Sequence, residues 1–158
     1  MSFRHILVSA LALAAPALLG IPPAALAAEQ DLSVNARLLL AARNADSAAL
    51  ARELKQGAAP NARNRLGETA LLIALKKNEL GMANAMLEAG TDINLAAVNG
   101  VTPLMAAAYA GQVQMVATLL ARGANVNAVD RLKKNAMTYA AGEGYAEIVK
   151  MLLAQGVD

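Results

Sequence analysis

The stretch NGVTPLMAAAYAGQVQMVATLLARGANVNA, residues 99–128, decides the fold of this chain, because its pattern recurs along the sequence at a constant interval of 33 residues. Glycines mark the interval most clearly, and they are Gly57, Gly90, Gly123 and Gly156. Leucines lie three positions before each of these glycines, and asparagines lie four positions after the first three of them. A fixed period of about 20–50 residues is the signature of stacked structural repeats. The sequence therefore predicts a repeat solenoid.

The same stretch carries signals for two short helices and the turn between them. Thr102 can accept hydrogen bonds from unpaired backbone N–H groups at a helix start, and Pro103 suits the first helical position, where no N–H is needed. Thr102-Pro103-Leu104 resembles the T-P-L-H motif of ankyrin repeats, with Met105 in place of the histidine. Gly111 resembles the glycine between that family's two helices. The family's repeat ending is similar to Leu119-Leu120, Gly123-Ala124 and Val126-Asn127.

The resemblance to ankyrin repeats covers about residues 31–158 and implies the fold. We expect an all-α ankyrin-repeat solenoid of about four helix-turn-helix repeats joined by β-hairpin-like turns. The repeats are expected at about residues 31–63, 64–96, 97–129 and 130–158. A helix of about eight residues is marginal in water by itself, so burial against neighbouring repeats must supply the order. The chain is 57% apolar but only 3% aromatic, so Ala, Leu, Val and Met must form the core.

The first 27 residues resemble a secretory signal peptide. Arg4 precedes an apolar run over residues 6–19, and Ala25-Leu26-Ala27 forms an A-x-A cleavage site. The alternative is an uncleaved membrane anchor, although 14 apolar residues interrupted by Pro16 are short for a bilayer span of about 20 residues. We expect cleavage after Ala27, which leaves residues 28–158 as one ankyrin-repeat domain without a membrane span. The signal peptide predicts a location in the periplasm, with secretion as the second choice.

Composition argues against catalysis and against general binding of polyanions. The chain has no Cys, and its one His, His5, lies in the predicted signal peptide, so the mature chain lacks a His-based triad, a thiol nucleophile and a His/Cys zinc site. Glu143 and Glu147 flank a predicted turn at Gly144 and need not face each other. Without residues 1–27 the chain keeps 13 basic and 12 acidic residues, a net charge of +1. We expect no enzyme activity, no cofactor, no metal site and no nucleic-acid partner.

Three residues depart from the repeat pattern in informative ways. Glu53 replaces the Met or Leu of later repeats, and we expect it to give the outer face of the first repeat a solvated, end-capping side chain. Asn78 takes a position that is glycine in the two later repeats, where we expect a left-handed residue. Lys133 replaces a hairpin glycine. If its turn keeps a left-handed residue, Lys133 is strained by about 1 kcal/mol, and otherwise this hairpin has another shape.

In ankyrin repeats the partner-binding positions are the hairpin tips and the concave side of the first helices. Carried over residue by residue, the resemblance assigns partner binding to Arg63, Arg65, Leu66, Glu68, Lys76, Val98, Asn99, Val101, Tyr109, Arg131, Leu132 and Lys134. Basic hairpins lie on either side of the neutral stretch 96–99, so a partner with an apolar centre flanked by acidic groups would complement them. Two questions stay open: whether these charges are ordinary solvated turns, and whether Tyr109 is an interface anchor or a cover over the neighbouring helix.

The resemblance implies a monomeric, non-catalytic module that binds another protein. Because some exported bacterial ankyrin proteins are thought to support oxidative-stress enzymes, one expectation is a helper of a stress-related envelope enzyme. A second is an immunity or inhibitor protein that masks a secreted effector. A third, from another class, is a binder of anionic envelope polymer through basic hairpin residues, which are Arg63, Arg65, Arg131, Lys133 and Lys134.

Overall fold

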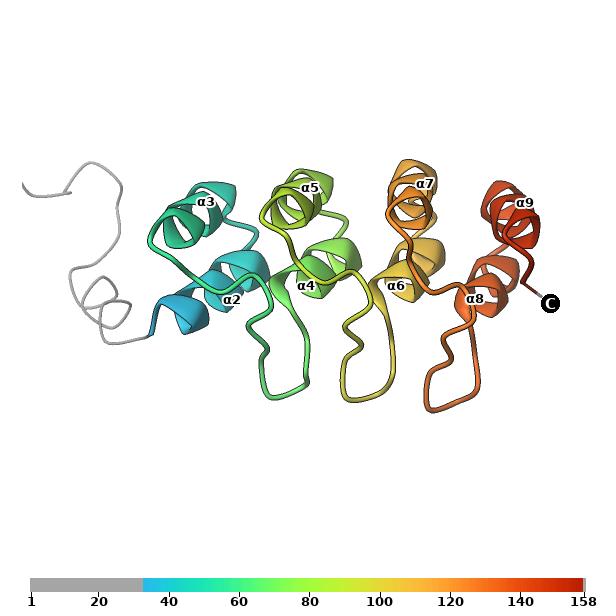
Figure 1. Ribbon diagram of the computed structural model, residues 1–158, viewed down its shortest axis with the longest axis horizontal. Helices are drawn as coiled ribbons and strands as arrows, with labels where there is room; N and C mark the ends of the chain where they lie inside the picture. Colours follow the sequence, from blue (N-terminus) through green and yellow to red (C-terminus); the bar gives the residue numbers. More distant parts are fainter. Residues whose placement is uncertain (1–32, 158) are drawn as a thin grey trace, which may run out of the picture. The chain divides into compact units, whose positions relative to one another are not determined.

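The computed structural model describes residues 33–157, so the predicted signal peptide lies outside the described residues. Within that range the chain forms eight helices and no strand. In order along the chain (Figure 1), they are α2 (Val34–Asn44), α3 (Ser47–Lys55), α4 (Ala70–Lys76), α5 (Leu80–Glu88), α6 (Pro103–Tyr109), α7 (Val113–Ala121), α8 (Ala136–Gly142) and α9 (Ala146–Ala154). The predicted all-α solenoid of four helix pairs is confirmed.

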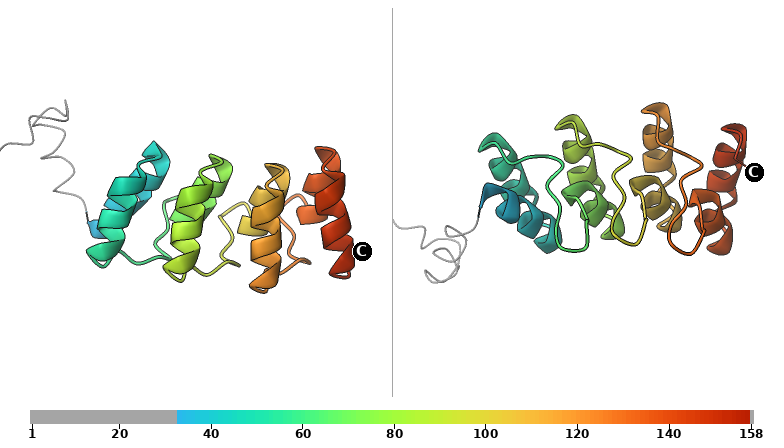
Figure 2. Two further views of the ribbon diagram at one scale, coloured as in Figure 1. Left: turned by 90° about the horizontal axis from the view of Figure 1, so that it is seen from above. Right: turned by 60° about the horizontal axis from the view of Figure 1, so that its bottom comes forward.

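The helices form two layers. The first helices of the four pairs, α2, α4, α6 and α8, pack in series to make one layer, and the second helices α3, α5, α7 and α9 make the other (Figure 1). Seen from above, the second helices lie in a row with similar directions (left panel of Figure 2). Long loops join each pair to the next and project from the side of the first helices (Figure 1). These loops and the first helices together line a concave surface.

Side-chain caps start the first helices, as the sequence predicts. Thr69 accepts a hydrogen bond from the backbone N–H of Leu72 at 3.3 Å, and Thr102 accepts one from Met105 at the same distance. Asn135 accepts one from Thr138 at 2.8 Å. Each cap satisfies an N–H group that has no partner inside its helix. The caps fix where these seven-residue helices begin, and burial holds them in place.

The core consists of Leu, Met and Ala side chains between the layers. The larger members, all with exposed fractions of 0 or 1%, include Leu38, Leu71, Leu75, Met82, Met86, Leu104, Met105, Leu119 and Leu152. Small alanines, among them Ala74 and Ala107, let the first helices approach closely. Flexible methionine side chains fill the remaining space between them. The core is therefore continuous through all four repeats.

The loops between repeats carry tight hairpin-like turns over residues 64–68, 97–101 and 130–134. In each turn the first residue's N–H donates to the last residue's C=O, at 3.0, 3.0 and 2.9 Å. Neighbouring turns are also joined, because Val98 N–H donates to Leu66 C=O at 2.8 Å and Arg131 N–H donates to Asn99 C=O at 3.0 Å. The right panel of Figure 2 shows the loops side by side. The three turns therefore form a connected row along one edge of the helix layer.

The asparagines that mark the 33-residue period connect successive repeats. Asn61 Oδ1 accepts the backbone N–H of Asp92 at 2.8 Å, and Asn94 Oδ1 accepts that of Asn125 at 2.8 Å. Asn35 Oδ1 makes the corresponding bond to Ala59 N–H at 2.7 Å. An exposed loop N–H that would otherwise face only water thus gains a fixed partner in the preceding repeat. This ladder is the structural reason for the repeating asparagine.

Two predicted backbone conformations are present. Asn78 has φ 61° and Lys133 has φ 62°, so both are left-handed. A Cβ on Gly67 would lie 2.9 Å from Val98 N, and one on Gly100 would lie 2.9 Å from Asp130 Cα. These two glycines therefore serve both a left-handed turn and close contact with the next hairpin. Lys133 lies exposed in the last described hairpin, so its side chain meets no following hairpin among the described residues. The cost at this position is therefore the strain of its left-handed backbone.

The prediction that Glu53 is solvated was wrong. Its side chain is only 2% exposed. Arg37 Nε donates to one carboxylate oxygen at 2.8 Å, and Arg52 Nε donates to the other at 3.1 Å. The arginine side chains are 21% and 56% exposed, so the arginines face the solvent and the carboxylate lies beneath them. The first repeat is therefore made wettable by arginines that cover a buried acid.

Candidate functional site

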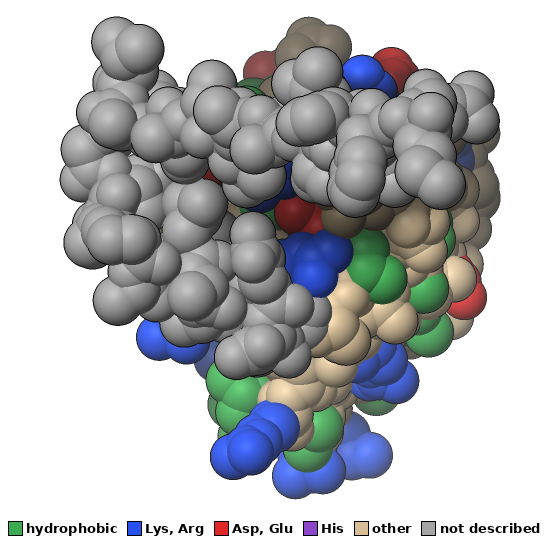
Figure 3. Space-filling view, turned by 90° about the vertical axis from the view of Figure 1, so that its left-hand side faces the viewer, with side chains coloured by type: hydrophobic (Ala, Val, Ile, Leu, Met, Phe, Trp, Pro, Cys, Tyr) green, Lys and Arg blue, Asp and Glu red, His purple; other side chains and the backbone are tan. Residues whose placement is uncertain are grey.

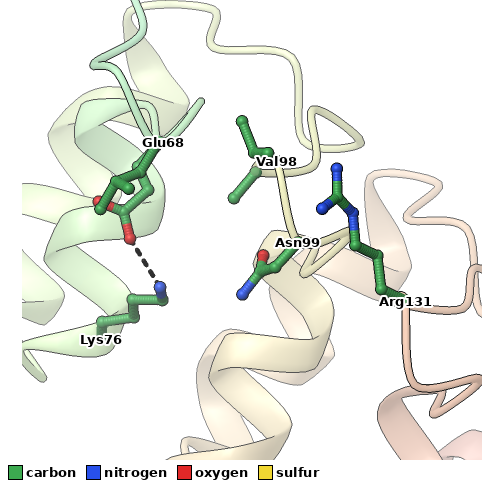
Figure 4. A pocket seen from close by; sticks show the side chains of 7 residues that line it. Glu68, Lys76, Val98, Asn99 and Arg131 are labelled. Carbon is green, nitrogen blue, oxygen red and sulfur yellow. Dashed lines mark hydrogen bonds and ion pairs between the residues drawn. The ribbon is translucent and has the colours of Figure 1, made fainter.

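Two adjoining pockets lie between the row of hairpins and the first helices. The hairpin pocket has a volume of about 210 Å³ and is lined by Leu66, Glu68, Lys76, Ala97, Val98, Asn99 and Arg131. Figure 4 shows the Glu68–Lys76 pair on one side and Arg131 on the other, with Val98 and Asn99 between them. The pocket thus spans residues from three successive repeats.

The second pocket, the tyrosine pocket, continues the first along the helix layer. Its volume is about 400 Å³, and it is lined by Lys76, Asn99, Val101, Met105, Ala106, Tyr109, Ala110 and Tyr139. Lys76 and Asn99 line both pockets, so the two form one concave groove. Short alanine side chains on α6 leave room above the helix, and the two rings border that room. The groove is mostly apolar, with a few polar groups at its edge.

Glu68 is the acidic group of the hairpin pocket, and its carboxylate is occupied. Lys76 Nζ lies 2.6 Å from one oxygen, and Asn64 Nδ2 donates to the other at 2.9 Å. Burial raises the pKa of Glu68, but the hydrogen bonds from Lys76 and Asn64 and the Lys76 charge outweigh it, so the pKa lies below its ordinary value. At neutral pH this ion pair carries no net charge into the groove.

Asp130 organises the third hairpin and binds Tyr139. Asp130 Oδ1 accepts the backbone N–H groups of Leu132 at 2.8 Å and Lys134 at 2.9 Å, while Oδ2 accepts the Tyr139 hydroxyl at 2.5 Å. The Tyr139 hydrogen bond is the main reason that the pKa of Asp130 is lowered. The same bond, with burial and the Asp130 charge, raises the pKa of Tyr139 to about 12. Asp130 therefore stays ionised and accepts three hydrogen bonds, two from its own hairpin and one from Tyr139.

The aromatic rings of Tyr109 and Tyr139 meet edge to face. Their centroids lie 5.9 Å apart at an interplanar angle of 85°. Tyr109 keeps 56% of its surface exposed, so it both covers the neighbouring helix and presents a ring to solvent. Lys134 Nζ lies 5.7 Å from the centroid of the Tyr139 ring, within reach of a cation–π interaction. The tyrosine pair gives the groove a rigid aromatic wall.

The basic residues of the hairpins have different roles. Arg63 donates from Nε to Gly67 C=O at 2.9 Å and from Nη2 to Ala96 C=O, so its side chain connects the first hairpin to the second. The guanidinium of Arg131 borders the hairpin pocket. Figure 3 shows Lys and Arg side chains among hydrophobic ones at the lower edge, the side from which the hairpins project. The exposed apolar side chains of these loops include Leu66, Val98, Val129 and Leu132.

Most of the residues assigned from the sequence line this groove. The lining members of that set are Leu66, Glu68, Lys76, Val98, Asn99, Val101, Tyr109 and Arg131. Lys134 lies beside Tyr139, Arg63 connects two hairpins, and Arg65 and Leu132 are exposed at hairpin tips outside the groove. Their role in partner binding stays a prediction.

Sequence reasoning missed several lining residues, which are Ala97, Met105, Ala106, Ala110 and Tyr139. Tyr139 was open to prediction. The position equivalent to Tyr109 in the last repeat is Gly142, 33 residues later. Tyr139 lies three residues before Gly142, and residues three apart share a helix face, so Tyr139 belongs to the concave face as well.

The described residues offer little for catalysis. Within 33–157 no three His, Cys, Asp or Glu side chains gather closely enough to hold a metal ion. The acidic groups at the groove, Glu68 and Asp130, are both held by internal hydrogen bonds. Of the helices in this range, none combines the length and the hydrophobicity that a bilayer crossing requires.

The fold is that of a helical repeat protein with a concave groove between its hairpins and its first helices. The family model described as ankyrin repeats in three copies matches residues 38–130 and 80–158, and the chain therefore belongs to the ankyrin-repeat family. No curated protein matches the chain in sequence. Ankyrin repeats generally mediate protein–protein interaction, and proteins built from them are typically non-catalytic. A protein partner follows from membership of the family.

Proposed function

We propose that this protein is an exported, non-catalytic binding module that holds a segment of a partner protein in the concave groove and against the hairpin tips. One observation carries the proposal: a groove with apolar walls has Arg131 at its edge, while its own carboxylates are already hydrogen-bonded. Apolar area with a few directed polar groups is what specific recognition surfaces use. Exposed Leu66 and Leu132, at 63% and 71%, extend the apolar surface onto the tips.

The cellular setting of this proposal rests on the amino-terminal sequence. A signal-like segment over residues 1–27 would deliver the repeats to the periplasm, with secretion as the second choice. There the partner would be an envelope enzyme, supported under stress by a monomeric ankyrin protein. The competing role is masking of a secreted effector, as an immunity or inhibitor protein does. Both roles use the same groove and differ in the partner.

Site-specific crosslinking tests the proposal. A photoreactive amino acid replaces Val98 in the groove or, as the matched control, Gln114, which is exposed on α7 in the other helix layer. We expect a protein adduct from position 98 and none from position 114 when periplasmic extract is illuminated. An endogenous enzyme in the adduct supports the helper role, and an adduct that forms only after an effector is supplied supports the masking role. Adducts from position 114 alone would contradict the proposal.

A binder of anionic polymer is the second candidate, and the exposed basic tips favour it. Arg65 is exposed on the first hairpin, and Arg131 and Lys133 are exposed on the third. Binding of this kind depends on screened charge, and in about 0.5 M salt the screening length is only about 4 Å. We expect partner binding in the groove to persist at that salt concentration. Complete loss of binding there would favour the polymer over the protein partner.

A further inference from the structure

The groove carries information about the chemistry of what it binds, and this inference rests on the proposed function. The charge that it presents is set by which ionic groups are already satisfied. Glu68 is paired with Lys76 at 2.6 Å, and Asp130 accepts three hydrogen bonds from its own hairpin and Tyr139. Arg131 lines the hairpin pocket with its side chain (Figure 4). Its backbone N–H donates to Asn99 C=O and thereby joins the second hairpin to the third. The groove therefore presents Arg131, while Glu68, the one carboxylate among the lining residues, is already paired with Lys76.

The two pockets differ in what they can hold. The hairpin pocket, at about 210 Å³, admits one modest side chain beside Arg131. The tyrosine pocket, at about 400 Å³, has Met105, Ala106 and the edge-to-face tyrosine rings on its walls, so it suits a large apolar side chain. Lys76 and Asn99 belong to both pockets, so the two occupants must be close neighbours on one face of the ligand.

An extended peptide satisfies that spacing. In an extended chain residues i and i+2 point to the same side and are separated by about 7 Å. On an α-helix the neighbours on one face are residues i and i+4, so a helical ligand and an extended ligand differ in the sequence spacing of the two side chains. A carboxylate is the complement of a guanidinium, because the two can form parallel charge-assisted hydrogen bonds.

We propose that the concave groove selects an extended peptide segment in which a carboxylate side chain binds Arg131 and an apolar side chain two residues away enters the pocket between Tyr109 and Tyr139. This ligand has one acidic group beside its apolar side chain, whereas the sequence suggested an apolar centre flanked by two acidic groups. The second acidic group has no site in the groove, because Arg63 donates to the carbonyls of Gly67 and Ala96 and lies outside both pockets. Specificity then comes from one charge and one adjoining side chain.

Fluorescence anisotropy with labelled nonapeptides tests this proposal on the full chain. The probes contain Asp-x-Leu or Leu-x-Asp in a Gly/Ser background, with Lys-x-Leu, Asp-x-Ser and an i, i+4 spaced version as comparisons. We expect one of the first two probes to bind at least about tenfold more tightly than the comparisons. Equal affinity for acidic and basic probes would overturn the proposal, as would preference for the i, i+4 spacing.

Matched variants locate the charge and the apolar contact. Arg131→Ala should weaken the best probe about tenfold, while Arg65→Ala, at the equivalent position of the first hairpin but outside both pockets, should change it less than twofold. The Arg131 side chain takes no part in the backbone bond to Asn99, so this variant should fold. Tyr109→Ala should also weaken the probe about tenfold, and Tyr109→Phe should not.

A charge exchange at Arg131 tests the peptide chemistry separately from the proposed function of protein binding in the groove. The Arg131→Glu variant should prefer the probe in which Lys replaces the Asp of the best probe, reversing the order seen with the natural chain. If crosslinks from position 98 form with a protein partner but no probe shows this charge preference, the peptide chemistry is wrong and the proposed function stands. If neither crosslinks nor probes report on the groove, both proposals fail.

Discussion

The hydroxyl of Tyr139 lies 2.5 Å from Asp130 Oδ2 and donates a hydrogen bond to it, which connects the third hairpin to helix α8. The other oxygen of Asp130 receives two backbone N–H groups and holds the turn closed. The first hairpin closes in the same manner, because Asn64 Oδ1 accepts the N–H groups of Leu66 and Glu68, each at 2.9 Å. The asparagine cannot supply the charge that Asp130 directs at the tyrosine. The hydrogen bond that connects the third hairpin to α8 therefore depends on the protonation of the Tyr139 hydroxyl.

The first prediction concerns stability at alkaline pH. The pKa of Tyr139 is raised to about 12, whereas an unfolded tyrosine titrates near pH 10. Below about pH 10 the hydroxyl is protonated in both states, so its contribution to folding is complete. Above that pH the unfolded chain loses its proton first, and the contribution disappears as pH rises through about 12. We expect the melting temperature of the natural chain to fall more steeply over this range than that of Tyr139→Phe.

The control for this prediction is Asp130→Asn. Asparagine can close the turn as Asn64 does, but it carries no charge, so the pKa of Tyr139 should return toward about 10. Phenolate absorbance measured against pH would report both values. A late tyrosine titration that survives in Asp130→Asn would show that Asp130 does not cause the shift.

The second prediction compares two left-handed hairpin positions. Gly100→Ala places a Cβ 2.9 Å from Asp130 Cα and strains a residue at φ 86°, so it should lower the free energy of unfolding by about 2–3 kcal/mol. Lys133→Gly removes side-chain strain at φ 62° where no described hairpin follows, so it should be neutral or stabilise by up to about 1 kcal/mol. Urea denaturation measures both. Equal losses at the two positions would contradict the role given to the neighbouring hairpin.

The helix pairs and their stacking could be predicted from the sequence because the signals for them lie within each repeat. The caps at Thr69, Thr102 and Asn135, and the left-handed Asn78, depend on residues within a few positions of one another. The 33-residue period then fixes the stack, since equivalent residues must lie in equivalent places. Two thirds of the residues assigned to the binding surface line the groove for the same reason, as their positions follow from the repeat.

What escaped prediction depends on side chains that meet across repeats or helices. Glu53 is buried because arginines on two different helices reach its carboxylate, and the sequence alone does not pair them. Arg63 connects two hairpins through the carbonyls of Gly67 and Ala96, one of them 33 residues away. Each of these side-chain pairings involves residues that the other repeats do not share, so the 33-residue period does not predict them.

The third prediction tests the buried acid of the first repeat. Glu53→Ala leaves a space and removes the carboxylate that accepts hydrogen bonds from Arg37 and Arg52, so it should lower the free energy of unfolding by about 1–3 kcal/mol. Glu53→Met introduces the residue that Met86 supplies at the equivalent position. It fills the space, and the two arginines, at 21% and 56% exposed, keep contact with solvent, so the loss should stay within about 1 kcal/mol. Chemical denaturation at neutral pH measures both variants. A Met variant as unstable as the Ala variant would mean that the charge itself is required.

The fourth prediction concerns the contact between Gly111 and Tyr145. A Cβ on Gly111 would lie 2.5 Å from Tyr145 Cζ, and the residue has φ 68°. Ala45 adopts φ 58° at the equivalent position of the first repeat, so the backbone alone accepts alanine at a cost of about 1 kcal/mol. We therefore expect Gly111→Ala to cost about 2–3 kcal/mol in the natural chain.

The Tyr145→Gln background separates the ring clash from the backbone strain in this prediction. Glutamine is the residue that Gln112 places one repeat earlier, where its Nε2 donates to Asn78 Oδ1 at 3.1 Å and to Leu75 C=O at 2.8 Å. With the ring gone, Gly111→Ala should cost only about 1 kcal/mol, giving a coupling energy of about 1–2 kcal/mol between the two positions in a double-mutant cycle. Thermal or urea denaturation of the four chains provides the cycle. Equal costs in the two backgrounds would show that the ring moves aside and that left-handed geometry alone selects glycine.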